Sequence, residues 1–234
     1  MIKDKMKIIR YENENYKEIY DEVVVEFELE IYVNNRPVCS RLCLKKNLQD
    51  MVVGFLLTRG YVSRYEDIDK IEIKNLGQSK GKCYCVVNKN RKIPQKHLNK
   101  YKIQPEEIVE AMEIFTQKSS LFKKTGGVHS SGILKGNKLI YFADDIGRQN
   151  ALDKTIGYIV RNEHNMNGIF ILFSGRITTE VLDKLLPESI EGIFSKSAVT
   201  KDAVLKGKKM GILLVGFIRG KRFNVYSGFE NKKY

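Results

Sequence analysis

Residues 144–154 (DDIGRQNALDK) carry five charged side chains, two amides and one glycine between two apolar stretches. Residues 138–142 before them are predicted to form a buried strand, and residues 155–160 after them to continue as a helix. Strand-to-helix junctions that combine acidic and basic side chains with a glycine are where α/β proteins usually hold anionic ligands. Together with the strand–helix alternation beyond Thr125, this junction favours a layered α/β domain with a ligand site at a strand end.

Two later segments end in a similar way. Residues 169–176 (IFILFSGR) are an apolar strand that runs into Ser-Gly-Arg, and residues 211–222 are an apolar strand that ends in a basic loop. Arginine can grip a phosphate through two parallel hydrogen bonds, lysine adds a point charge, and glycine lets the backbone approach a ligand closely. Plainer interpretations remain open: the basic loop as a solvated turn, and Thr178 or Thr179 as the cap of a helix.

Taken with residues 125–129 (TGGVH), 31–35 (IYVNN) and 53–57 (VGFLL), this ordered series resembles the formate dehydrogenase accessory sulfurtransferase (FdhD) family, from about Val24 to Tyr226. The resemblance implies a cytidine-deaminase-like three-layer fold for the larger part of the chain. It also implies a cytoplasmic homodimer that binds a molybdenum bis(guanine dinucleotide) cofactor. Such a protein receives sulfur from a cysteine desulfurase and passes it to that cofactor for a formate dehydrogenase.

The resemblance directs attention to the residues at the strand ends. A carboxylate at 144 or 145 is expected to orient Arg148 or to accept hydrogen bonds from a guanine edge, and helix capping is the plainer interpretation. The family usually has histidine where this chain has Gln149, so a proton-shuttling role at that position is lost. The candidate cofactor-binding residues are His129, Asp145, Gly147, Arg148, Ser174, Gly175, Arg176, Phe217, Ile218, Arg219, Gly220, Lys221 and Arg222.

The sulfur carrier in this chemistry is a cysteine persulfide, and here the chain departs from the family. Family members carry a Cys-Gly or Cys-x-x-Cys loop before the helix at Pro105, whereas residues 88–97 of this chain contain no cysteine and the segment is shortened. Persulfide transfer needs an accessible thiolate. Cys83 and Cys85 are the candidate substitutes, on one face of a strand. If that face is buried they are packing residues; if it borders the cleft, Cys85 is the better candidate.

The sequence predicts no structural metal. The spacings Cys39–Cys43 and Cys83–Cys85 do not match the usual zinc-ligand patterns. The zinc signature of the deaminases is also absent, because His129 is followed by two serines rather than by a glutamate at the expected spacing, and no Pro-Cys-x-x-Cys occurs. Zinc-dependent deamination is therefore excluded.

Composition bounds the remaining possibilities. With 42% hydrophobic residues and no apolar run near the roughly 20 residues that span a bilayer, the chain is expected to be cytosolic, without a membrane partner. The net charge of +13 is compatible with nucleic acid, an anionic small ligand or an acidic protein. The lysines are scattered and are not interleaved with aromatic side chains, so nucleic-acid binding ranks last.

Two versions of the family function thus stay open. One is a sulfur carrier that binds the guanine dinucleotide cofactor and promotes its sulfuration. The other is a catalytically silent relative that stores, delivers or senses the cofactor, which the missing loop cysteine and the change to Gln149 favour.

A smaller N-terminal portion, residues 1–104, is predicted to pack on a larger domain of residues 105–234, and the fold class is mixed α and β. The start, to about Asn15, is polar and is expected to be loosely ordered. The expected elements are a strand over 23–33, a turn at 34–37, a returning strand over 38–44, a helix over 47–59 capped by Asn47 and ended by Gly60, strands over 68–73 and 82–87, and a helix from Pro105 to Phe122.

Overall fold

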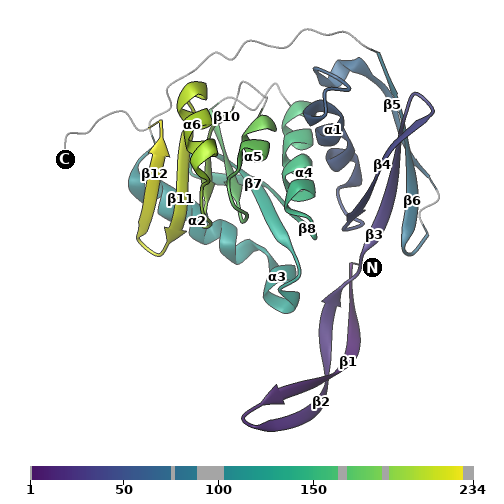
Figure 1. The fold of residues 1–234 in the computed structure, drawn as a ribbon, viewed down its shortest axis with the longest axis vertical. Helices are drawn as coiled ribbons and strands as arrows, with labels where there is room; N and C mark the ends of the chain where they lie inside the picture. The colour runs from purple at the N-terminus through teal and green to yellow at the C-terminus, as the bar shows by residue number, and fades with distance from the viewer. Residues whose placement is uncertain (1, 75–76, 89–102, 163–167, 186–189, 229–234) are drawn as a thin grey trace.

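The computed structural model describes residues 2–74, 77–88, 103–162, 168–185 and 190–228. Within these residues the chain forms three separate β-sheets and six α-helices, arranged in layers with a long hairpin projecting from them (Figure 1). The predicted fold class, mixed α and β with a layered larger domain, is confirmed. The predicted boundary at residues 104/105 falls between the strands of the four-stranded sheet and those of the six-stranded sheet.

The larger domain is built on a six-stranded sheet with the order β12-β11-β10-β9-β7-β8. Strands β9, β10 and β11 are parallel, and β7 runs antiparallel to both β8 and β9, so β8 points the same way as β9 to β11. The carboxyl ends of four strands and the first residue of β7 therefore lie at one edge of the sheet. The strands are β7 (His129–Lys135), β8 (Lys138–Asp145), β9 (Ile169–Phe173), β10 (Ile190–Ser195), β11 (Leu213–Arg219) and β12 (Arg222–Ser227).

Helices cover both faces of this sheet. Strand β9 is buried at every position because its alternate side chains enter two different cores. Ile169, Ile171 and Phe173 pack in the core that contains α4, whereas Phe170 and Leu172 pack with α2. A strand that is apolar throughout is typical of a sheet covered on both faces. The helices are α2 (Pro105–Lys118), α4 (Arg148–Arg161), α5 (Thr179–Asp183) and α6 (Lys201–Met210).

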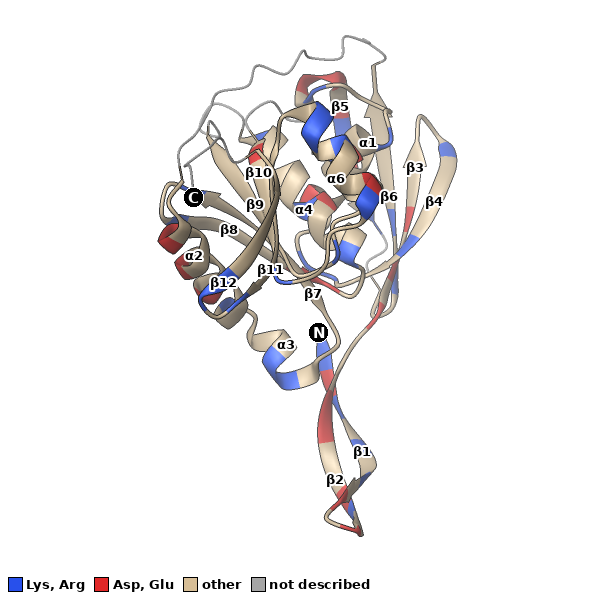
Figure 2. Cartoon of the chain, turned by 60° about the vertical axis from the view of Figure 1, so that its left-hand side comes forward, with Lys and Arg blue, Asp and Glu red and all other residues tan. Residues whose placement is uncertain are grey.

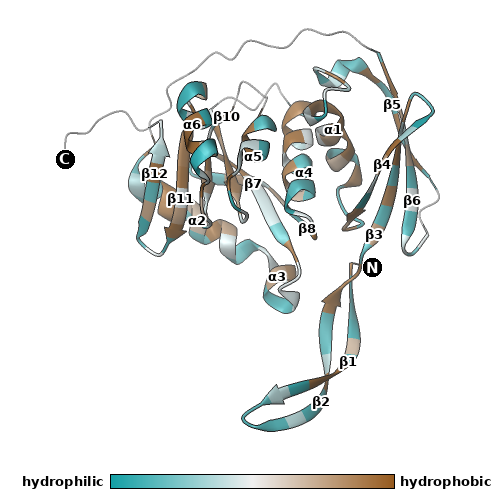
Figure 3. Ribbon diagram, viewed as in Figure 1, coloured by the Kyte–Doolittle hydropathy of each residue, from teal (hydrophilic) through white to brown (hydrophobic). Residues whose placement is uncertain are grey.

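The N-terminal portion contributes a second sheet of four strands, in the order β4-β3-β6-β5, with α1 (Leu48–Thr58) against it. Asn34 and Asn35 both have positive φ angles, 47° and 65°, and they form the predicted turn between β3 and β4. Hydropathy follows this layering, with apolar residues concentrated on α1 and on the inner strands (Figure 3). The remaining elements are β3 (Phe27–Val33), β4 (Arg36–Cys43), β5 (Ile68–Lys74), β6 (Lys80–Val87) and a 3₁₀ turn at Tyr65–Asp67.

Two glycines allow the two portions to join closely. Helices α1 and α4 lie side by side between the two sheets (Figure 1). A Cβ atom added at Gly54 of α1 would lie 1.9 Å from the carbonyl oxygen of Asp153, and one at Gly157 of α4 would lie 1.9 Å from that of Asp50. Only glycine, which has no Cβ atom, leaves this space open. The backbones of the two helices are therefore in direct contact there.

Residues 3–24 form an arm rather than a loosely ordered start, so that prediction was wrong. Strands β1 (Lys3–Glu12) and β2 (Asn15–Val24) pair over ten residues each and project away from the body (Figure 1). Cross-strand pairs such as Ile8 with Ile19 stabilise this hairpin despite its polar composition. The expected single strand over 23–33 is also wrong, because the chain leaves β2 at Val24 and enters a different sheet at Phe27.

Three smaller predictions fail for tertiary reasons. The helix from Pro105 is interrupted at Ser119, whose hydroxyl caps a second helix, α3 (Ser120–Thr125), through the amide of Phe122 at 3.0 Å. Asn47 precedes α1 but does not cap it, because its side-chain amide donates to the hydroxyl of Tyr141 at 3.0 Å instead. Strand β8 lies at the edge of its sheet and is only partly buried.

No helix in the described part of the chain has both the length and the apolar character that crossing a membrane requires.

Candidate functional site

Two adjoining cavities lie at the carboxyl edge of the six-stranded sheet, between the strand ends and helices α2 and α3. The larger lobe has a volume of about 440 Å³ and the smaller lobe about 290 Å³. Thr116, Ser174 and Lys196 line both lobes and so mark the boundary between them. This is the edge at which open α/β sheets usually bind their ligands.

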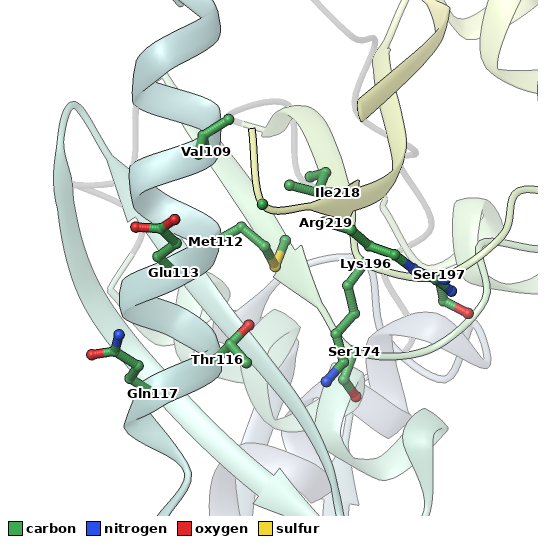
Figure 4. A pocket seen from close by; sticks show the side chains of 11 residues that line it. Val109, Met112, Glu113, Thr116, Gln117, Ser174, Lys196, Ser197, Ile218 and Arg219 are labelled. Atoms are coloured by element: carbon green, nitrogen blue, oxygen red, sulfur yellow. The ribbon is translucent and has the colours of Figure 1, made fainter. Parts of the chain in front are cut away.

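Successive strand ends supply one wall of the larger lobe. Ser174 follows β9, Lys196 and Ser197 follow β10, and Arg219 ends β11. Helix α2 forms the opposite wall, and Figure 4 shows Met112 and Thr116 reaching from it towards Ile218 and Lys196. The lining residues of this lobe are Val109, Met112, Glu113, Thr116, Gln117, Ser174, Lys196, Ser197, Ile218, Arg219 and Gly220.

His129, the first residue of β7, lies in the smaller lobe. Its Nδ1 is 3.2 Å from the hydroxyl of Ser174, which also accepts a hydrogen bond from the amide of Ser130 at 2.9 Å. Burial lowers the pKa of His129, and the nearby charges of Arg148 and Lys196 lower it further. The site thus combines a histidine that favours its neutral form with two cations, a setting that suits an anion.

Arg148 lies directly behind this wall, at the start of α4. Its Cδ is 3.2 Å from the place that a Cβ atom on Gly175 would occupy, so the glycine at 175 makes room for the arginine. The Nε atom of Arg148 is buried without a hydrogen-bond partner, and so are both amide atoms of Gln149. Buried polar groups are rarely left unpaired. An anionic ligand that reached the guanidinium would satisfy it.

Asp145 is a structural residue, which corrects its predicted role towards a guanine or towards Arg148. Its carboxylate is fully buried and lies 2.6 Å from the ammonium of Lys154. It also accepts hydrogen bonds from the amides of Leu44 and Gly147, each at 3.1 Å, and from the side chain of Asn150 at 3.0 Å. Because both of its oxygens are occupied, the carboxylate links the β4–α1 connection to the start of α4 and is not available to a ligand.

Asp144 has protein partners as well. Its carboxylate accepts hydrogen bonds from the hydroxyls of Ser130 at 2.6 Å and Ser119 at 2.9 Å. It therefore fixes the start of α3 against the start of β7. Gly147 is the residue before α4 and provides no side chain to a cap.

The predicted basic residues divide into two groups. Arg219 lines the larger lobe, with Ile218 and Gly220, whereas Arg176, Lys221 and Arg222 are exposed and line neither lobe. The register of β11 against β12 shifts between Gly216 and Arg219. Phe217 takes a positive φ of 52° there, and its amide donates to the carbonyl of Ser197 at 3.0 Å. The strained backbone thus holds the end of β11 against the Lys196 loop.

Lys196 is the most important of the site residues that the sequence did not predict. It lines both lobes, and its ammonium lies 5.1 Å from the centroid of the Phe122 ring. A signal was present in residues 190–197 (IEGIFSKS), where a largely apolar strand is followed by a small hydroxyl residue and a cation, as at 169–176. The lining residues of α2 carry no comparable signal, because they belong to an ordinary amphipathic helix, in which Met112 and Phe115 lie on the buried face.

None of the four cysteines lines either lobe. Cys83 and Cys85 are 0% and 2% exposed and point into the core shared with α1, which is the placement expected of packing residues. Their sulfur atoms are 3.7 Å apart, and the neighbouring thiol and burial together raise the pKa of Cys83. Burial raises the pKa of Cys43 to about 12 and also raises that of the half-buried Cys39. The loop predicted to lack a thiol lies mostly outside the described residues.

A metal centre finds no support in the described residues, where no three His, Cys, Asp or Glu side chains are placed to hold an ion together.

The fold and the site together define a layered α/β protein with a cation-lined, two-lobed cavity at the carboxyl edge of its sheet.

The chain belongs to the FdhD/NarQ family, whose model matches residues 24–88 and 77–232. It is 35% identical over 256 residues to the sulfur carrier protein FdhD of Listeria innocua serovar 6a, with 98% of each chain covered. It is 30% identical over 256 residues to the sulfur carrier protein FdhD of Bacillus licheniformis, with 97% of this chain and 96% of that protein covered. Because these alignments are longer than the chain, both relatives have residues that it lacks.

A solved structure shares the fold. The crystal structure of a formate dehydrogenase accessory protein from Desulfotalea psychrophila matches with a TM-score of 0.85 and 25% sequence identity, and the match covers 98% of this chain and 99% of that one.

Proposed function

We propose that this protein is a cytoplasmic accessory protein of a formate dehydrogenase and that it binds the guanine dinucleotide form of the molybdenum cofactor in the two-lobed cavity. The observation that carries this proposal is the cation Lys196 at the junction of the lobes, with Arg219 in the larger lobe and Arg148 behind the wall. Phosphates of a dinucleotide need such cations. The buried Nε of Arg148 has no hydrogen-bond partner and would gain one if the ligand reached behind the wall.

The placement of the cysteines favours the version of this function in which sulfur does not travel on this chain. A persulfide carrier presents a mobile, accessible thiolate to two partners. Cys43, Cys83 and Cys85 are buried, and burial raises the pKa of Cys39. The protein then holds or delivers the cofactor while a cysteine desulfurase supplies sulfur by another route. In the other version, the chain promotes sulfuration as a carrier, and one of these thiols becomes accessible during transfer.

Incubation with a cysteine desulfurase and cysteine, followed by intact-mass analysis, separates the two versions. The silent version predicts no added sulfur atom on the wild-type protein. A sulfur adduct that disappears in Cys85→Ala but persists in Cys43→Ala would establish a carrier thiol at Cys85 and overturn the silent version.

A test of the accessory role uses a cell that lacks its own copy of this protein and has an inactive formate dehydrogenase. The wild-type chain should restore formate oxidation, and Lys196→Ala should not. Lys201→Ala is the matched control, because Lys201 is exposed at the start of α6 and lines neither lobe. Equal restoration by Lys196→Ala and the wild type would contradict the proposal.

The protein is further proposed to act as a homodimer, with the β1–β2 arm as the contact between copies. An isolated two-stranded hairpin is marginally stable in water. Five large apolar or aromatic side chains on this arm are at least half exposed: Met6, Ile9, Tyr11, Tyr16 and Tyr20. Such a concentration of exposed apolar surface marks an interaction site.

Charge favours a second copy as the occupant. Residues 1–24 carry five basic and six acidic side chains, so the remainder of the chain has a net charge of +14. Red and blue alternate along the arm in Figure 2, while blue dominates α3 and several other elements. An arm without the positive charge of the body can approach the body of another copy, whereas two bodies repel each other.

A further inference from the structure

We infer that the smaller lobe is a base-stacking site in which the Phe122 ring supports the purine of a bound nucleotide. The inference rests on the proposed function, because the nucleotide is the guanine dinucleotide end of the cofactor. It goes further by naming the lobe that takes the base and the side chain that holds it.

Phe122 is exposed where a phenylalanine is normally buried. Its side chain is 42% exposed and lines the smaller lobe. The ring is nevertheless presented from a fixed backbone, because the Phe122 amide donates to the hydroxyl of Ser119 at 3.0 Å. That hydroxyl in turn donates to Asp144 at 2.9 Å. An exposed aromatic side chain that a fixed backbone presents on a cavity wall can serve for base stacking.

The neighbouring groups place the rest of the nucleotide. The ammonium of Lys196 lies 5.1 Å from the Phe122 ring centroid, at the boundary with the larger lobe. A phosphate bound to Lys196 therefore has its attached base within reach of the ring. Gly126 also lines the smaller lobe, and a Cβ atom added there would meet nothing within 4 Å, so the space at this wall is open.

The alternative positions for a base are less suitable. Phe115, the other phenylalanine among the described lining residues of the smaller lobe, is only 2% exposed and packs edge-on against Phe142 at 5.5 Å. Among the described residues that line the larger lobe none is aromatic, and their apolar surface comes from Val109, Met112 and Ile218. The base is therefore assigned to the smaller lobe, and the larger lobe is left for the remainder of the dinucleotide.

Calorimetric titration with GDP, ADP and inorganic pyrophosphate tests this assignment. Phe122→Ala should weaken GDP and ADP binding by roughly 5- to 150-fold, the usual range for one lost base–aromatic stack. Pyrophosphate has no base, so its affinity should not change. Phe122→Tyr should retain the affinity of the wild type for all three.

Ile114→Ala is the matched control. Ile114 is 41% exposed on α2 and lines neither lobe, so its truncation should leave all three affinities unchanged. Unchanged GDP affinity in Phe122→Ala would overturn the inference, and so would an equal loss of pyrophosphate and GDP affinity. If the wild type bound neither GDP nor pyrophosphate, the proposed cofactor site itself would fail, which is a different outcome from the loss of stacking alone.

Discussion

Lys154 and Asp145 form an ion pair of 2.6 Å in which both side chains are completely buried. Removing one partner of a buried pair leaves an uncompensated charge, which typically costs about 3–5 kcal/mol. Lys154→Met should therefore lower the free energy of unfolding by about 3–5 kcal/mol, as measured by urea denaturation. The loss is expected because Asp145 also joins Leu44 and Asn150 to the α4 junction.

The control for this prediction is Lys70→Met. Lys70 pairs with Glu72 at 3.2 Å, but its side chain is 61% exposed. Exposed pairs contribute little, so this variant should unfold at the urea concentration of the wild type. Equal effects of the two substitutions would contradict the structural role assigned to Asp145.

Gly157→Ala should separate α4 from α1. The added methyl group would lie 1.9 Å from the carbonyl oxygen of Asp50, and backbone atoms can move away only if the helices shift. Overpacking of this kind typically lowers the free energy of unfolding by about 1–3 kcal/mol. The urea concentration at the midpoint of unfolding should fall accordingly. Gly77→Ala is the control, because its Cβ would meet only an ordinary contact of 3.5 Å. A Gly157→Ala protein as stable as the wild type would disprove the direct helix contact.

His129 should make the stability of the protein depend on pH. Its pKa in the folded protein is below 6.5 because of burial and of Arg148 and Lys196, whereas the unfolded chain titrates near the ordinary value of about 6.5. The unfolded state then binds more protons than the folded state. The contribution of His129 to the free energy of unfolding is therefore fully present above about pH 6.5 and is lost as the pH falls through the pKa of the folded state.

An NMR titration of the His129 ring measures this pKa directly, and His129→Gln should flatten the stability profile below about pH 6.5. A folded-state pKa at or above that of the unfolded chain would contradict the arrangement of cations around the ring.

The arm should control self-association. Replacing Tyr11 and Tyr16, whose rings are 5.1 Å apart, with serine should weaken the dimer by roughly tenfold or more in sedimentation experiments, because aromatic anchors dominate most interfaces. Leu205→Ser removes a comparable exposed apolar side chain from α6 and should have no effect. A dimer of unchanged strength in the tyrosine variant would exclude the arm as the contact.

Much of the site was predictable from the sequence because parallel strands end at one edge of a sheet. Ser174 and Arg219 are far apart in the chain, and the pattern of apolar strands followed by polar residues predicted that both would lie at this edge. His129 reaches the same edge differently, as the first residue of the antiparallel strand β7. The turn at Asn34 and Asn35 was equally predictable from the sequence, since asparagine tolerates the positive φ angles found there.

The failures come from contacts that sequence patterns do not encode. Asp145 has the sequence context of a ligand-binding carboxylate, but Leu44, 101 positions away, occupies one of its oxygens. The break at Ser119 depends on its hydrogen bond to Asp144, in a different element. The arm was missed because its two strands are mostly exposed and show no period-two apolar pattern, so only their pairing with each other defines them.

The most direct test of the cofactor site is a calorimetric titration of GDP into the wild type, Lys196→Ala and the control Lys201→Ala. Saturable binding is expected for the wild type and for the control, and this binding should weaken at high salt. Lys196→Ala should lose roughly tenfold or more in affinity. Equal GDP affinities in all three proteins, or no binding to the wild type, would contradict the assignment of this cavity to the guanine dinucleotide.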